Sequence, residues 1–139
     1  MGTTNDERVM VGKALKADFA QLKLELRRRH GSEGYTGTLA EKDTVVEVPA
    51  SLRGKRQTAA DLLREIEQVA CIDTPADQIK PLAERQRALL PYAMKWGDKW
   101  GPAIAIPLAR KEASEAKRGT QWAGKRGVTV WLVAGMCSE

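Results

Sequence analysis

Apolar residues recur at helical spacing through the N-terminal part of the chain. They are separated by four, four, three and four positions, which places them on one face of a helix: Val11, Leu15, Phe19, Leu22 and Leu26. Thr4 and Glu7 have the spacing of a capping box ahead of them, and His30 with Gly31 is typical of a helix end. The spacing predicts one long amphipathic helix over residues 5–29.

Strands are indicated where apolar and β-branched residues alternate over short segments. Residues 36–42 and 44–48 predict a hairpin, with Asp43 turning the chain between its two arms. Residues 103–108 and 128–134 alternate most clearly and predict a second antiparallel pair. The segment that joins this second pair is long for a hairpin loop, which is typical of a loop that binds, moves or contains a short helix.

Two further helices are expected in the middle of the chain. Residues 58–70 place their apolar side chains on one face, and Pro75 suits the first turn of a third helix. Pro81 predicts either a kink in that third helix or a separate helix that ends at Leu90. The order of elements predicts an α+β fold in a single domain, residues 1–139. We expect about four strands in a mainly antiparallel sheet, with the long N-terminal helix and the two middle helices packed on it.

The composition is that of an ordinary globular protein. Of its 139 residues, 42% are hydrophobic and 29% are charged, a balance that excludes wholesale disorder. The longest uncharged apolar run, residues 128–136, is well short of the roughly 20 residues that cross a bilayer. The first residues have no basic and apolar leader. We therefore expect a cytoplasmic protein with no membrane partner.

The net charge of +5 is distributed over several short clusters rather than along one stripe. Three arginines, residues 27–29, end the first expected helix, and further cations lie between residues 110 and 126. A modest positive field attracts any anion, so nucleotides and nucleic acid both stay open as partners.

Glycine, aromatic and charged residues are interleaved most densely in two segments, 34–42 and 96–103. Glycine allows close approach of the backbone, and a tryptophan face can stack on a base. If the two segments share one cavity, arginines from the long segment after residue 108 can reach into it and meet a phosphate. The candidate ligand-binding residues are Tyr35, Thr36, Gly37, Thr38, Trp96, Asp98, Lys99, Trp100, Arg110 and Arg118. The alternative is structural, with glycines that permit turns and tryptophans that pack in the core.

Residues 34–42 (GYTGTLAEK), 98–103 (DKWGPA) and 131–139 resemble parts of small uncharacterised accessory proteins encoded by bacteriophages and phage-derived islands. The resemblance is confined to these motifs and leaves out the middle helices. It implies a phage accessory setting, in which many proteins counter host defence or bind host factors. No activity and no functional residue is carried over from it.

The chain offers little for catalysis. His30 is the only histidine, so a histidine-rich metal site is excluded, and no serine or cysteine motif accompanies it. Neither a P-loop nor a dinucleotide-binding glycine motif is present. We therefore expect no cofactor and favour binding over catalysis. A small metal-dependent hydrolase that uses Glu41 or Asp98 stays open as an alternative.

These observations favour a phage-type accessory protein that acts in counter-defence. It would bind and sequester a small anionic ligand, such as a signalling nucleotide, in the cytoplasm of the host cell. We also expect a homo-oligomer, in which a second copy of the chain closes the edges of the sheet. The alternative from another class is an interaction protein that docks on a host protein or a nucleic acid through its basic loops.

Overall fold

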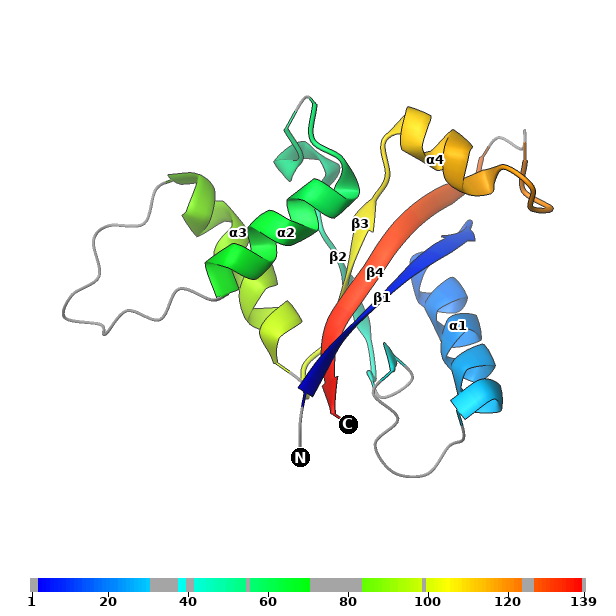
Figure 1. Cartoon of the computed structure of the whole chain (residues 1–139), viewed down its shortest axis with the longest axis horizontal. Helices are drawn as coiled ribbons and strands as arrows, with labels where there is room; N and C mark the ends of the chain where they lie inside the picture. The colour runs from blue at the N-terminus through cyan, green and yellow to red at the C-terminus, as the bar shows by residue number, and fades with distance from the viewer. Residues whose placement is uncertain are drawn as a thin grey trace.

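A computed structural model describes residues 3–30, 38–39, 42–54, 56–70, 84–98, 100–123 and 127–138 of the chain. Its elements are β1 (Thr3–Gly12), α1 (Leu15–His30), β2 (Val45–Glu47), the 3-10 helix η2 (Ala50–Leu52), α2 (Ala59–Ala70), α3 (Glu84–Gly97), β3 (Ala103–Pro107), α4 (Arg110–Lys117) and β4 (Thr129–Ser138). Figure 1 shows α1 on one side of the sheet and α2 and α3 on the other. The α+β fold is therefore confirmed.

The four strands form one mixed sheet in the order β1-β4-β3-β2. β4 lies between β1 and β3 and pairs antiparallel with both, so the expected pairing of residues 103–108 with 128–134 is confirmed. β2 pairs parallel with β3, and Val45 lies opposite Ala103. The expectation of a mainly antiparallel sheet holds for the pairs around β4 and is wrong for β2.

The prediction of one helix over residues 5–29 is wrong for its first third. Residues 3–12 form β1, which pairs with β4 along its whole length of 10 residues, and only residues 15–30 are helical. The consecutive apolar residues Val9, Met10 and Val11 suit a strand, because they place side chains on both faces of the sheet. On α1 the helical spacing was read correctly, since Phe19 and Leu26 are buried there.

The predicted hairpin over residues 36–48 is also wrong. Of its first arm, the structure describes only Thr38, Leu39 and Lys42, and these residues are not in a strand. The second arm, β2, pairs with β3 instead. The amide of Ala103 donates to the carbonyl of Thr44 at 3.0 Å, and the amide of Val48 donates to that of Ala105 at 2.8 Å. Residues 103–106 are at most 1% exposed, so β3 is the central apolar partner that the short β2 needs.

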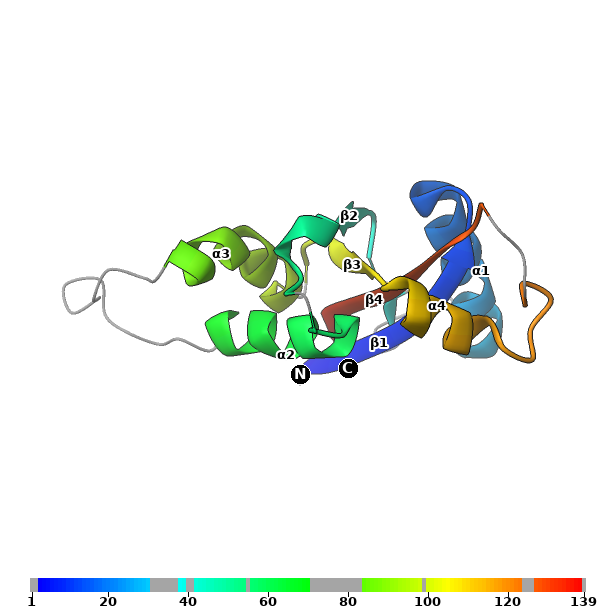
Figure 2. The ribbon, with the colours of Figure 1, turned by 90° about the horizontal axis from the view of Figure 1, so that it is seen from above.

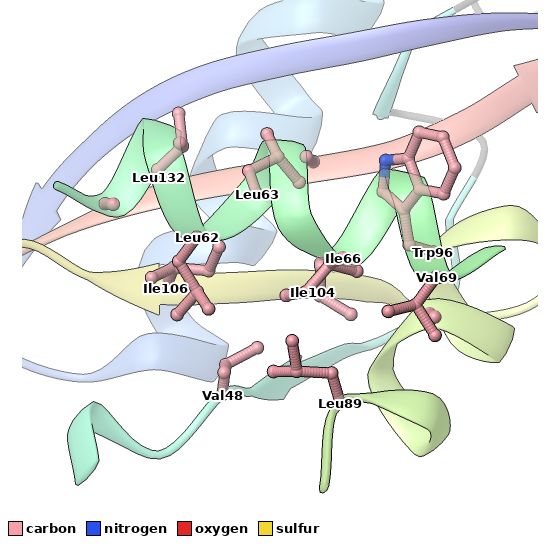
Figure 3. Close-up of a cluster of buried hydrophobic side chains, with 13 residues drawn as sticks. Val48, Leu62, Leu63, Ile66, Val69, Leu89, Trp96, Ile104, Ile106 and Leu132 are labelled. Carbon is pink, nitrogen blue, oxygen red and sulfur yellow. The ribbon is translucent and has the colours of Figure 1, made fainter. Parts of the chain in front are cut away.

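Two hydrophobic cores lie on opposite faces of the sheet. One core joins α2 and α3 to the sheet and includes Leu62, Ile66, Leu89, Ile104 and Ile106 (Figure 3). The other core joins α1 to the opposite face; its larger side chains are Met10, Phe19, Leu26, Trp131 and Val133. Alternate residues of β3 and β4 enter the two cores, as the period of a strand requires. The molecule is therefore a sheet between two helical layers (Figure 2).

The middle helices agree with the sequence in part. α2 covers residues 59–70 as expected. α3 begins at Glu84 and continues through Pro91 to Gly97, beyond the expected end at Leu90. Pro75, at the expected start of the third helix, and Pro81 lie outside the described residues. Within the described part of the chain, every helix is too short or too polar to cross a membrane.

Candidate anion-binding site

The two glycine-rich and aromatic segments meet at a single buried contact. The Lys42 ammonium donates a hydrogen bond to the backbone carbonyl of Asp98 at 2.9 Å, and Lys42 is only 1% exposed. The segments around residues 34–42 and 96–103 therefore do lie together at this point. Tyr35, Thr36, Gly37 and Lys99 lie outside the described residues.

The Lys42 contact is a buried, packed junction. The Asp98 carbonyl also accepts the amide of Gly101 at 2.9 Å, and the Asp98 carboxylate accepts the amide of Trp100 at 2.9 Å. A Cβ atom at Gly135 of β4 would lie 3.0 Å from Lys42 Cε, so the lysine passes directly over this glycine. Thr38 is buried as well, at 4% exposure. The junction ties the turn before β3 to β4, and Asp98 also lines a recess of about 520 Å³ beside α2 and α3.

The two tryptophans of the second segment have different environments. Trp96 belongs to the core beneath α2 and α3, and its indole nitrogen donates to the Asn5 side chain at 3.1 Å. Trp100 is 63% exposed. Packing therefore explains Trp96, while Trp100 is presented to solvent.

A recess lies at the other end of the sheet, between α4 and the start of β4. Its volume is about 900 Å³. Cationic and hydroxyl side chains line it together with small and apolar residues: Leu108, Arg110, Ala113, Ser114, Lys117, Arg118, Ala123, Gly127, Val128, Thr129 and Val130. None of these described lining residues is a carboxylate. Among the described lining residues, an anion would meet Arg110, Lys117 and Arg118 without a competing carboxylate.

The spacing along α4 explains why the cations face the recess. Arg110, Ser114 and Lys117 are separated by four and three residues, so they share one face of the helix. Glu112 and Glu115 lie on the opposite face. The carboxylate of Glu112 accepts the amide of Ala59 at 3.2 Å, which directs its charge toward the start of α2 and away from the recess. α4 is thus a helix with its positive face turned to the recess.

The structure separates the predicted site residues into two places. Asp98 and Trp100 precede β3, whereas Arg110 and Arg118 follow its other end (Figure 1). The arginines therefore do not reach the Lys42 junction, and the expected single cavity is not formed by the described residues. Arg110 and Arg118 instead line one recess together, and their assignment to an anion stays a prediction at that location.

Sequence reasoning missed three polar residues of this recess, namely Ser114, Lys117 and Thr129. The periodicity of residues 110–117, with cations on one helical face and acids on the other, was the available signal. A short helix was one of the expectations for this segment, and α4 confirms it, but helical spacing was not used to group these side chains.

No metal site is found in the described residues, because histidine, cysteine, aspartate and glutamate side chains do not gather there in groups of three or more. Glu41, one of the two carboxylates considered for a hydrolase, lies outside the described residues. Asp98 caps the turn at Trp100. Comparison with protein-family models, with curated proteins and with solved structures finds no match for this chain.

Proposed function

We propose that this protein binds a small anionic ligand, such as a signalling nucleotide, in the recess between α4 and β4, and that it does so without catalysis. The observation that carries the proposal is the lining of that recess. Three cationic side chains and two hydroxyls converge there, and the described lining contains no carboxylate.

The chemistry of the recess suits a phosphate attached to a less polar group. The guanidinium groups of Arg110 and Arg118 present paired donors to phosphate oxygens, and Ser114 and Thr129 add hydroxyls. Leu108 and Val130 supply an apolar wall for the rest of the ligand. A volume of about 900 Å³ falls in the range of about 300–1,000 Å³ that is usual for small-molecule sites. In the phage setting that the sequence motifs imply, such a protein would sequester the ligand and blunt host defence.

The test is calorimetric titration with cyclic and linear nucleotides and with inorganic phosphate as the simplest probe. We expect one or more nucleotides to bind, and the R110Q/R118Q variant to weaken that binding roughly 10- to 100-fold. This corresponds to the loss of about 1.5–3 kcal/mol for a charged hydrogen bond. The matched control is R27Q/R28Q, which removes the same charge from the exposed face of α1 and should leave the affinity unchanged.

Two results would contradict the proposal. Absence of heat with every nucleotide would remove the binding function, and equal loss in the two double variants would remove the recess as its site. Chromatography of the titrated nucleotide gives a third check. Conversion of the ligand by the protein, abolished by a chelator, would replace sequestration by metal-dependent hydrolysis.

A further inference from the structure

β1 is an edge strand along its full length. It is the first strand in the order β1-β4-β3-β2 and pairs with β4 on one side. In Figure 1 it runs across the front of the molecule, and no helix or strand of the described chain passes in front of it. An edge of 10 residues presents a row of backbone N–H and C=O groups to a further strand.

The two halves of this edge differ in character. Residues 5–8 are polar and engaged in ion pairs, because Arg8 binds Asp6 at 2.9 Å and Arg64 of α2 binds Glu7. Residues 9–12 are Val-Met-Val-Gly, and Val9 is 56% exposed. This second half has neither the lysine nor the proline with which natural edge strands prevent pairing. The open part of the edge is therefore its apolar half.

We propose that this half of β1 pairs antiparallel with the same segment of a second copy of the chain, with Met10 at the two-fold axis. In a continuous sheet that axis is perpendicular to the sheet, so facing residues come from the same face and have the same parity. Centring on Met10 places Val9 opposite Val11 of the second copy, and brings Lys13, the residue that follows β1, level with Glu7.

Other centres of the pairing are less favourable. An axis at Glu7 or at Arg8 places two like charges directly opposite each other, which destabilises a strand pair. An axis at Val9 places Glu7 opposite Val11 and Arg8 opposite Met10, so charged groups face apolar ones. An axis at Val11 places Val9 opposite Lys13. Of the centres in this half, Met10 therefore matches apolar with apolar residues, and it brings Lys13, just beyond β1, level with the acidic Glu7 that already binds Arg64. This complementarity of the segment with itself is the reason for choosing a second copy as the partner.

The pairing would bring the two anion recesses near each other. Val11 lies opposite Val130 in the β1·β4 register, and Val130 lines the recess. Because the two-fold axis is perpendicular to the sheet, both recesses would open on the same side of the joined sheet. The proposed pairing does not depend on ligand binding, and the residues that test it carry none of the recess cations.

The experiment is analytical ultracentrifugation of the full chain over a range of concentrations. We expect a dimer of the 15.3 kDa chain, converted to monomer by V9K. The control L24K makes the same change at an exposed leucine of α1, 47% exposed, and should remain dimeric. Far-UV circular dichroism verifies that both variants are folded. Should V9K fail to fold, V9T, which keeps β propensity but removes apolar surface, takes its place with a weakened dimer as the expected result.

A wild-type protein that stays monomeric at all concentrations would overturn the proposal, as would a folded V9K that dimerises like the wild type. The register has its own test in the V9C/V11C variant under mild oxidation. We expect a disulfide between position 9 of one copy and position 11 of the other, identified by peptide mapping. A bond between the two positions 9 would overturn the Met10 register.

Discussion

At the scale of single residues, Lys42 is the side chain whose position needs most explanation. A lysine that is 1% exposed has lost the water around its ammonium group, and this is tolerated only where hydrogen bonds replace that water. The Asp98 carbonyl supplies one such bond at 2.9 Å. Gly135 supplies the space, since its missing side chain is what allows Lys42 to cross β4. The two motifs that first suggested a ligand site thus have a structural role at this junction.

The Gly135→Ala variant tests this role. The new methyl group would lie 3.0 Å from Lys42 Cε, and the buried lysine has little room to move away. We expect a loss of about 1–3 kcal/mol in the free energy of unfolding, the usual cost of overpacking, measured by chemical denaturation.

Two further variants test whether contact with Lys42 causes this loss of stability. Gly97→Ala is the matched control, because its nearest atom, Ala70 Cβ, would be at 3.9 Å and the substitution should be nearly neutral. In a double-mutant cycle with Lys42→Ala, the cost of Gly135→Ala should largely disappear. An undiminished cost in that background would show that Lys42 is not what fills the space over Gly135.

At the scale of elements, two segments with the spacing of a helix capping box fold differently. Thr58 and Asp61 form a capping box at the start of α2. The backbone amide of Asp61 donates to the Thr58 hydroxyl at 3.0 Å, and the amide of Thr58 donates to the Asp61 carboxylate at 3.1 Å. Thr4 and Glu7 have the same spacing and lie in β1. The difference is in the residues that follow, because a regular apolar face follows Thr58 whereas Val9 to Val11 is a continuous apolar run. Local spacing was enough to predict α2 and the two later strands. Residues 3–12 form a strand because they pair with β4, which is distant in sequence.

The pairing of β2 could not be predicted from its own residues either, because its partner strand is distant in sequence. A strand of three residues carries little periodicity, and its partner β3 lies more than fifty positions later. The site was predictable only to the extent that its charges lie close in sequence. Arg110 and Arg118 were assigned to one site and do line one recess, and their distance from Trp100 follows from the direction of β3.

The ion pair between α2 and α3 makes the stability of the fold depend on pH. Arg85 of α3 binds Glu65 of α2 at 2.8 Å, and this hydrogen bond lowers the pKa of Glu65 below its ordinary 4.5. Because the pKa is lower in the folded protein, the stabilisation is complete above about pH 4.5 and is lost as the pH falls through the folded value.

We therefore expect Glu65→Gln to reduce the free energy of unfolding at pH 7 by at most about 1 kcal/mol, since both side chains are about one-third exposed. The difference from the wild type should shrink as the pH falls below 4.5. Denaturant titrations at pH 7 and pH 3 measure it. Glu25→Gln, on the exposed face of α1, makes the same substitution away from the contact of α2 with α3 and is the control. A difference for Glu65→Gln that is constant with pH would contradict the role of the carboxylate.

At the scale of the whole molecule, the placement of the cations distinguishes a small ligand from a nucleic acid. Arginines 27–29 end α1, and the recess cations lie on and beside α4. Figure 1 places that end of α1 and α4 at opposite ends of the sheet. A nucleic acid is bound along a continuous stripe of positive charge, and these two groups do not form one. The arrangement favours a local ligand over a long polyanion.

A salt series measures this difference directly. A duplex contacted at about 6–10 phosphates loses about 10³–10⁵-fold in affinity between 50 and 200 mM salt. A nucleotide held by Arg110, Lys117 and Arg118 releases fewer counterions, so its affinity should fall much less over the same range. We expect duplex DNA to bind weakly in gel shifts and to be released by 200 mM salt, while nucleotide binding persists in calorimetry.

Tight duplex binding that survives 200 mM salt, and that R27Q/R28Q and R110Q/R118Q weaken equally, would show that both groups of cations contact one polyanion. The protein would then be an interaction protein for nucleic acid, and the recess would be one part of a larger surface.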